Sequence, residues 1–136
     1  MKDKAFLDSN ILLYAFSMDD PEKQERSGRI IESEPCCTSV QALNEFCNVC
    51  LKKWRFNRQT IETAIDYLLG WCSVDQVSTK TLRRALAMQE KYGYSYYDCV
   101  MLASALDYDC NIIYSEDMSD GQVIEGRLKI TNPFKQ

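Results

Sequence analysis

Four carboxylates are the side chains best suited to chemistry, and three of them stand where apolar segments of the sequence begin or end. Asp8 ends the first apolar run, Asp98 enters a helix that is apolar nearly all round, and Asp117 follows a predicted strand. The fourth, Glu45, lies off the apolar stripe of its own predicted helix. Oxygen ligands of this kind suit magnesium or manganese, which keep several waters and also bind a substrate's phosphate. The set predicts hydrolysis of a phosphodiester by a metal-activated water.

Each of these acids also has a purely structural interpretation. Asp8 can cap the helix that follows it, because aspartate accepts hydrogen bonds from the free N–H groups at a helix start. Ser95-x-x-Asp98 resembles a capping box with aspartate in place of the usual glutamate. Glu45 can be an ordinary solvated residue, and Asp117 can belong to a surface turn. The four acids gain a joint role only if the fold brings them together.

Histidine is absent from the sequence. Its absence excludes Ser-His-Asp and Cys-His nucleophilic schemes, paired-histidine cleavage of RNA and Cys/His zinc sites. Any hydrolytic chemistry must therefore use carboxylates, and a metal ion suits them. The 20 acidic residues outnumber the 16 lysines and arginines, which argues against binding nucleic acid through bulk positive charge. The balance favours a local acidic site beside a local basic one.

One basic cluster stands next to Trp54 and Phe56 in the sequence. Cations favour the C-terminal ends of helices, so the cluster can be a solvated helix end. Alternatively, it can contact the phosphates of RNA while the aromatic rings stack on bases. Both interpretations stay open. The cluster consists of Lys52, Lys53, Arg55 and Arg58.

Seven cysteines, an odd number, lie mostly within apolar runs, where cysteine behaves as a small hydrophobic residue. Cys47-x-x-Cys50 looks like half of a zinc knuckle, but both residues fall on a predicted buried stripe and no second pair has suitable spacing. We therefore expect core filling and a reducing, cytoplasmic setting. The sequence shows no signal peptide and no apolar run of membrane-spanning length, so we expect no membrane association.

Strands and helices alternate along the sequence and supply the positions for these side chains. Helical spacing predicts a helix from Val40 to about Trp54, with Glu45 pointing away from its buried stripe. That stripe consists of Val40, Leu43, Cys47, Cys50, Leu51 and Trp54. Another helix follows Asp8, and the rest cover residues 22–31, 60–71, about 79–91 and 95–106. The predicted strands cover residues 4–7, 36–38, 72–77 and 111–114, with one last short strand drawn from 122–124 and 128–131.

This alternation predicts one α/β domain over residues 1–136, with a parallel sheet covered by helices on both faces. Open sheets of this kind bind their ligands at the carboxyl ends of the strands. Asp8 and Asp117 follow two such strands, so a parallel arrangement gathers them at one edge. Asp98 enters a buried helix, where a carboxylate is costly unless something pairs with it.

Several short motifs occur in an order that resembles the PIN-domain family, and the resemblance spans essentially the whole chain. Among PIN domains, the sequence is most similar to the compact VapC-like toxins of toxin–antitoxin pairs. The motifs are Asp8-Ser-Asn10, Ser39 through Asn44-Glu45-Phe46, Tyr96-Tyr97-Asp98, Ser115-Glu116-Asp117-Met, and the ending Asn132-Pro133-Phe134.

The resemblance implies a magnesium- or manganese-dependent endoribonuclease. It implies a three-layer fold with the sheet order 3-2-1-4-5, a homodimer, and a small cognate antitoxin that inserts into the active-site groove. The acidic quartet would be Asp8, Glu45, Asp98 and Asp117, with Asp8, Asp98 and Asp117 as the metal ligands. Asn10, Ser115 and Asp120 would support it. The position of the fourth acid stays open among Glu116, Asp117 and Asp120.

Two other classes of protein remain as alternatives. A haloacid-dehalogenase-type phosphatase also begins with an acid after its first strand, but it needs a second acid two residues on, where this chain has Asn10. A catalytically silent PIN-like module, acting in binding or as a scaffold, would usually have lost members of the quartet. All four matching positions are acidic here, which favours the enzyme.

Overall fold

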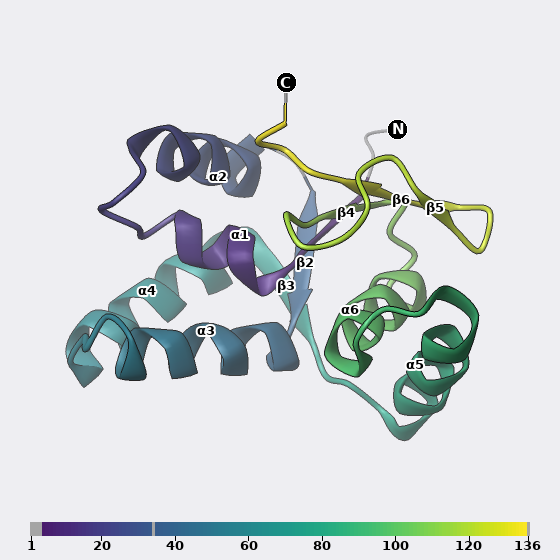
Figure 1. Ribbon diagram of the computed structural model, residues 1–136. Coiled ribbons are helices and arrows are strands. Elements are labelled where there is room, and N and C mark those ends of the chain that lie inside the picture. The colour runs from purple at the N-terminus through teal and green to yellow at the C-terminus, as the bar shows by residue number, and fades with distance from the viewer. Residues whose placement is uncertain (1–3, 34, 136) are drawn as a thin grey trace.

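The computed structural model describes residues 4–33 and 35–135, and the first three residues, Glu34 and Gln136 lie outside these ranges. A sheet runs through the molecule with helices packed around it (Figure 1). The strands are β1 (Ala5–Leu7), β2 (Cys36–Ser39), β3 (Cys72–Asp75), β4 (Ile112–Tyr114), β5 (Val123–Ile124) and β6 (Leu128–Thr131). The helices are α1 (Ser9–Tyr14), α2 (Pro21–Ser33), α3 (Val40–Lys52), α4 (Arg58–Trp71), α5 (Thr79–Tyr92) and α6 (Tyr96–Asp107). Within the described ranges, no helix is long and apolar enough to cross a membrane.

The sheet confirms the predicted α/β class, and its strand order differs from the predicted 3-2-1-4-5 in one respect. The order is β3-β2-β1-β4-β6-β5, with only β5 and β6 antiparallel. The single last strand of the prediction is therefore wrong, because this region is a hairpin. Glu125 and Gly126 have left-handed φ angles of 50° and 69°, and Arg127 N–H donates to the Ile124 carbonyl at 3.1 Å. Two consecutive left-handed residues make the tight turn that reverses the chain.

Helices cover both faces of the sheet, as predicted. Helices α1 to α4 gather on one side, and α5 and α6 pack against each other on the opposite side (Figure 1). Right-handed crossovers produce this division, because the chain moves outward from β1 to β3 and then returns past β1 to β4. The last residues of β1 and β4, Leu7 and Tyr114, are paired. Strands are added to the sheet in opposite directions on the two sides of the β1–β4 pair. Open α/β sheets bind their ligands at such a point.

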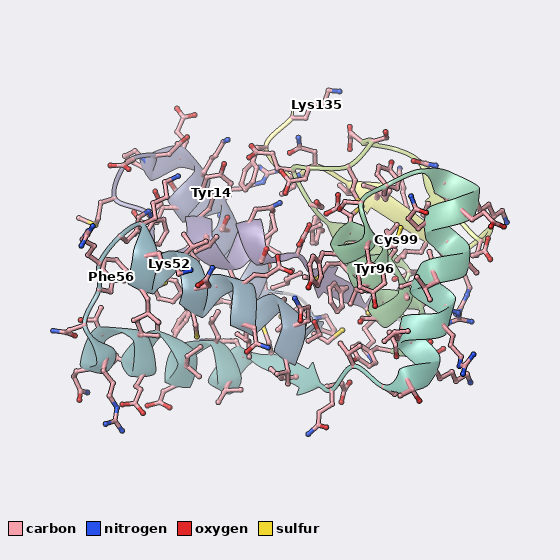
Figure 2. All side chains as sticks on the ribbon, turned by 60° about the horizontal axis from the view of Figure 1, so that its bottom comes forward. Tyr14, Lys52, Phe56, Tyr96, Cys99 and Lys135 are labelled. Atoms are coloured by element: carbon pink, nitrogen blue, oxygen red, sulfur yellow. The ribbon has the colours of Figure 1, made fainter. Side chains whose placement is uncertain are left out.

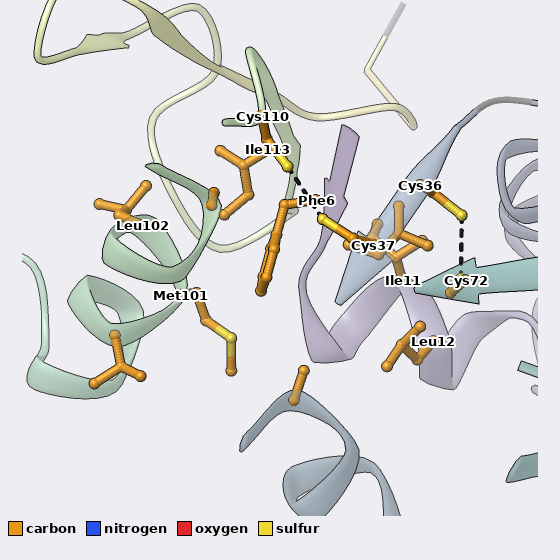
Figure 3. Close-up of a cluster of buried hydrophobic side chains, with 14 of the residues drawn as sticks. Phe6, Ile11, Leu12, Cys36, Cys37, Cys72, Met101, Leu102, Cys110 and Ile113 are labelled. Carbon is orange, nitrogen blue, oxygen red and sulfur yellow. Dashed lines mark hydrogen bonds between the residues drawn. The ribbon is translucent and has the colours of Figure 1, made fainter. Parts of the chain in front are cut away.

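The core contains most of the cysteines. Figure 3 shows two close thiol pairs, and the first lies beside Phe6 of β1: the Sγ atoms of Cys37 and Cys110 are 3.1 Å apart, as are those of Cys36 and Cys72. Six of the seven cysteines are buried, and no disulfide forms among the described residues. The prediction of core filling is confirmed, and the reducing compartment stays a prediction.

Helix α3 turns a different face to the core from the one predicted. Val40 and Leu51, which the sequence placed on the buried stripe, are 40% and 55% exposed. The predicted stripe omits Phe46, whose ring packs against Phe16 of the segment after α1 with 5.6 Å between centroids. Glu45 therefore borders the buried face and is half-buried, instead of pointing away from it. The side chains that α3 buries are Ala42, Phe46 and Cys50.

Candidate active site

Asp8 leaves the carboxyl end of β1 and caps helix α1, as its structural interpretation predicts. Its Oδ1 accepts a hydrogen bond from the Ser9 N–H at 2.7 Å, and its own N–H donates to the Tyr114 carbonyl at 3.1 Å. The residue is more than a cap, because it is only 3% exposed. Its second oxygen, Oδ2, accepts from the Ser115 hydroxyl at 2.7 Å. A carboxylate is thus buried where the two central strands end.

Burial raises the pKa of Asp8 from 3.8 to about 7, because the charged carboxylate loses its hydration. Hydrogen bonds from Ser115 and Ser9 lower this pKa, and the negative charges of Asp98 and Asp117 raise it. The two other acids therefore lie near enough to Asp8 to repel its charge. Three of the predicted carboxylates meet at one edge of the sheet.

Asp98 stands in the first turn of α6, where its backbone N–H donates to the hydroxyl of the capping residue Ser95 at 3.2 Å. Its side chain is half-buried. Burial raises its pKa, hydrogen bonding with Ser95 lowers it, and the charges of Asp117 and Glu45 raise it further. Asp98 therefore connects Glu45 electrostatically to the other acids, and the fold brings the whole predicted quartet together.

Two polar residues hold Glu45. The Ser9 hydroxyl donates to its Oε1 at 3.0 Å and lies 3.5 Å from Asp8 Oδ1. Gln41, one helical turn earlier, donates through Nε2 to Oε2 at 3.1 Å. Because a hydroxyl has one proton, the shorter contact makes Glu45 the main acceptor. Ser9 thus links the start of α1 to α3.

Two of the predicted supporting residues hold Asp117 in the loop after β4. Asn10 donates through Nδ2 to Asp117 Oδ2 at 2.9 Å, and the Ser115 hydroxyl accepts from the Asp117 N–H at 3.2 Å. Asn10 also accepts from the Glu116 N–H at 3.4 Å. Ser115 therefore contacts both Asp8 and Asp117, while Asn10 ties α1 to the acidic loop.

Glu116 faces away from the other acids. Its carboxylate forms an ion pair with Lys23 of α2 and accepts a hydrogen bond from the Tyr14 hydroxyl. The Lys23 ammonium also lies 4.6 Å from the centre of the Tyr14 ring and 5.2 Å from that of Phe134. Glu116 is thus neutralised by a cation and fastens the acidic loop to α1 and α2.

Asp120, the third possible position for the fourth acid, holds the C-terminal segment. Its Oδ1 accepts from the Asn132 backbone N–H at 2.8 Å. The negative charge of Asp117, by contrast, acts on both Asp8 and Asp98. The geometry therefore favours Asp117 as the fourth acid, and the contacts of Asp120 support the chain end instead of the acidic cluster.

Within the described ranges, the acidic cluster is not paired with a positively charged side chain. Among the described residues, none of the four carboxylates forms an ion pair with lysine or arginine. In the same part of the chain, no three acidic or cysteine side chains are close enough to hold a metal ion alone, so the predicted three-carboxylate shell is not preassembled. Magnesium needs only one or two carboxylates when waters and substrate phosphate complete its shell. The donor set fits Mg²⁺ or Mn²⁺ on these terms.

The predicted RNA-binding residues form what we call the α3–α4 basic cluster, and they lie apart from the acids. Lys52 and Phe56 are at the end of α3 and the following turn, on the left of Figure 2. Lys53 is eight positions beyond Glu45, which is about 12 Å along a helix. Arg58 forms an exposed ion pair with Glu62 at 2.9 Å. The cluster consists of Lys52, Lys53, Arg55 and Arg58.

Sequence reasoning missed three residues that hold the acids. Ser9 lies inside the quoted motif between Asp8 and Asn10, but its bond to Glu45 depends on how α3 is rotated. Gln41 precedes Glu45 by four positions, a spacing that places side chains together on a helix, so this contact was detectable. The sequence gives no indication that Lys23 pairs with Glu116, because only the fold brings α2 close to that residue.

The fold and the site together define a parallel α/β domain with an acidic cluster at the carboxyl ends of its central strands. A family model described as the PIN domain matches residues 5–119. The chain therefore belongs to the PIN-domain family. No curated protein matches it by sequence.

Solved structures of toxin–antitoxin proteins share this fold. A toxin–antitoxin complex from Klebsiella pneumoniae is 19% identical with a TM-score of 0.72, and the match covers 97% of this chain and 99% of that one. VapC20 of Mycobacterium tuberculosis, described as a sarcin-ricin-loop-cleaving toxin, is 18% identical with a TM-score of 0.70 over 90% and 98% of the two chains. VapBC2 of Rickettsia felis, bound to promoter DNA, is 16% identical with a TM-score of 0.67 over 95% and 98%.

Proposed function

We propose that this protein is an endoribonuclease that hydrolyses RNA phosphodiester bonds with magnesium or manganese. The observation that carries the proposal is the buried Asp8, whose pKa burial raises to about 7. Beside it lie Glu45, Asp98 and Asp117, which form no ion pair with a lysine or arginine in the described part of the chain. At neutral pH such a cluster needs protons or a cation to offset its charge. Membership of the PIN-domain family supports nuclease chemistry.

The residues of the site divide into acids that would hold the cation and neighbours that orient those acids. Asp8 and Asp98 would be direct ligands, with Asp117 as a further one. When bound, the ion would supply an activated water and offset negative charge on the phosphate. Ser115 fixes the carboxylate of Asp8 and the backbone of Asp117. A water beside Ser115 would be oriented by the same hydroxyl, so no histidine is needed.

We further propose that the protein is the toxin of a toxin–antitoxin pair, with a small antitoxin as its partner. The proposal rests on the fold that it shares with the Klebsiella complex and with VapC20. A cavity of about 190 Å³ offers the antitoxin an apolar place to dock, lined by Phe16, Met18, Asp19, Trp54 and Phe56. We also propose that the protein forms a homodimer and acts in the cytoplasm.

The decisive experiment is to incubate the purified protein with transfer and ribosomal RNAs and to map the ends of the products. Attack by a metal-activated water leaves 5′-phosphate and 3′-hydroxyl ends, and EDTA should abolish the cleavage. Asp8→Asn and Asp98→Asn should each lose activity while keeping the fold, because an amide fills the same space without the charge. A 2′,3′-cyclic phosphate, or cleavage in excess EDTA, would refute the mechanism. RNA binding with no cleavage in manganese would favour the silent PIN-like module.

A further inference from the structure

A second concave surface lies at the same edge of the sheet as the acids. It consists of two adjoining cavities of about 200 and 360 Å³, which share Arg26, Pro133 and Lys135 among their lining residues. Helix α2 forms one wall of the larger cavity, and the ends of β4 and β6 with the C-terminal segment form the other. We call the larger cavity the α2 groove.

The α2 groove is lined by positively charged side chains. Three cations, Arg26, Arg29 and Lys135, line it, and none of its lining residues in the described ranges is a carboxylate, although acids outnumber bases 20 to 16 in the chain. Among the described residues, Arg26 and Lys135 form no ion pair, and Arg29 forms an exposed one with Glu25. An exposed pair of this kind contributes little and exchanges readily. The guanidinium forks of the two arginines match the oxygens of a phosphate.

The α2 groove adjoins the acidic site through the end of β4. Tyr114, the last residue of that strand, lines the groove, and the next residue, Ser115, donates its hydrogen bond to Asp8. Lys23 lines the smaller cavity and pairs with Glu116 of the acidic loop. The two cavities therefore border the segment after β4 that contacts Asp8 through Ser115.

The groove is separate from the α3–α4 basic cluster. Figure 2 shows Lys135 at the top of the molecule, well away from Lys52 and Phe56 on the left. The smaller cavity differs as well, because Asp20 and Glu22 line it and repel phosphate. The α2 groove, which no described carboxylate lines, is therefore a more favourable place for phosphate than the smaller cavity.

We propose that the α2 groove binds the phosphate backbone of the RNA strand next to the cleaved bond, through Arg26, Arg29 and Lys135. The proposal rests on the proposed function, because it assigns a binding role beside the same site. In this arrangement the cleaved phosphate lies at the acidic cluster, and the neighbouring phosphates of the RNA strand contact the positively charged side chains of the groove. The negatively charged cluster then needs no bulk positive charge to retain its substrate, which accounts for an RNA-binding protein with a net charge of −4.

The test compares two triple variants of equal net charge in the Asp98→Asn background, which prevents cleavage. Arg26→Gln, Arg29→Gln and Lys135→Gln remove the groove cations. The control removes three exposed cations that line neither cavity and form no ion pair in the described ranges, Lys80, Arg83 and Lys129. Fluorescence anisotropy with a labelled single-stranded RNA, measured from 50 to 200 mM salt, gives the affinity and its salt dependence. Circular dichroism checks that both variants fold.

The groove variant should bind RNA about 10- to 100-fold more weakly at 0.1 M salt, with a slope of log K against log salt smaller by about 2, because about 0.7 is lost for each phosphate contact. The control should keep the slope of the parent. In the active protein, the groove substitutions should raise KM and leave kcat unchanged, as expected for contacts made equally in the ground and transition states.

Each other outcome has its own meaning. If the parent binds and wild type cleaves RNA, but the groove variant behaves like the control, the groove proposal is wrong and the nuclease stands. If neither protein binds or cleaves any RNA, the proposed function itself fails. Unchanged RNA binding with lost affinity for a polyglutamate peptide would assign the groove to an acidic polypeptide and overturn the proposal.

Discussion

Without a metal ion, the protein should lose stability as the pH rises from 5 to 8, and Asp8 should be the main cause. Burial raises the folded-state pKa of Asp8 from 3.8 to about 7. Between these values the folded state binds more protons than the unfolded state, so the free energy of unfolding decreases with pH. The stabilisation from this proton is complete below about pH 4 and is lost as the pH passes through about 7.

The structure sets the size of the effect. About 3 pKa units at roughly 1.4 kcal/mol per unit correspond to roughly 4 kcal/mol over the whole range, and about 2.5 kcal/mol of this falls between pH 5 and 8. Asp98 acts in the same direction, because burial also raises its pKa. No histidine titrates in this window, since the chain has none. Carboxyl groups with ordinary pKa values titrate below pH 5.

Urea unfolding in EDTA at pH 5, 6, 7 and 8 measures the effect. Asp8→Asn should flatten the profile, because an amide does not titrate. The variant should still fold, since its Oδ1 can accept from the Ser9 N–H and its amide N–H can donate to the Ser115 hydroxyl oxygen. Asp66→Asn, an exposed change on α4, is the matched control and should keep the wild-type slope. Manganese at pH 8 should restore the stability of wild type and the control, but not of Asp8→Asn. A flat wild-type profile, or an equal slope in Asp8→Asn, would refute the reasoning.

Three further predictions test the site and the core. Neutralising all four residues of the α3–α4 basic cluster should weaken RNA binding and reduce its salt slope by about 3; an unchanged slope would make the cluster a solvated helix end. Asn10→Ala should lower kcat at least tenfold, because it frees the Asp117 carboxylate, while Tm changes little; wild-type kcat would show that this bond is not needed. Phe46→Ala should cost about 3 to 5 kcal/mol in urea unfolding, whereas Leu51→Ala should cost less than about 0.5 kcal/mol. A larger cost for Leu51→Ala than for Phe46→Ala would show that α3 buries the face predicted from the sequence.

Most of the fold was predictable because its signals are local. Apolar runs, the Ser95 cap, and the alternation of strands with helices fix the elements and the parallel sheet. The final hairpin was not predictable in the same way, since it depends on Glu125 and Gly126 both adopting left-handed backbone angles. Only glycine adopts such angles routinely, so a glutamate at the first of these two positions does not indicate a turn in the sequence.

The site was predictable as a list of acids, but not as an arrangement. Asp8 and Asp98 follow from their positions at element ends. Glu45 was assigned through the family resemblance, while spacing placed it on the wrong side of α3. The rotation of that helix depends on Phe46 packing against Phe16, a contact between segments that sequence spacing does not reveal. The same holds for Lys23, which reaches Glu116 only through the tertiary fold.

The two interpretations of Asp8, helix cap and metal ligand, describe one arrangement. Each carboxylate oxygen offers about two acceptor positions, and the bonds from Ser9 N–H and Ser115 use one on each oxygen. A second position on each oxygen therefore remains for a cation. Because the capping bond and the Ser115 bond also fix the plane of the carboxylate, the cap of α1 orients the same group that would bind the cation. Asparagine at position 8 should thus keep the cap and lose the cation, whereas alanine should lose both.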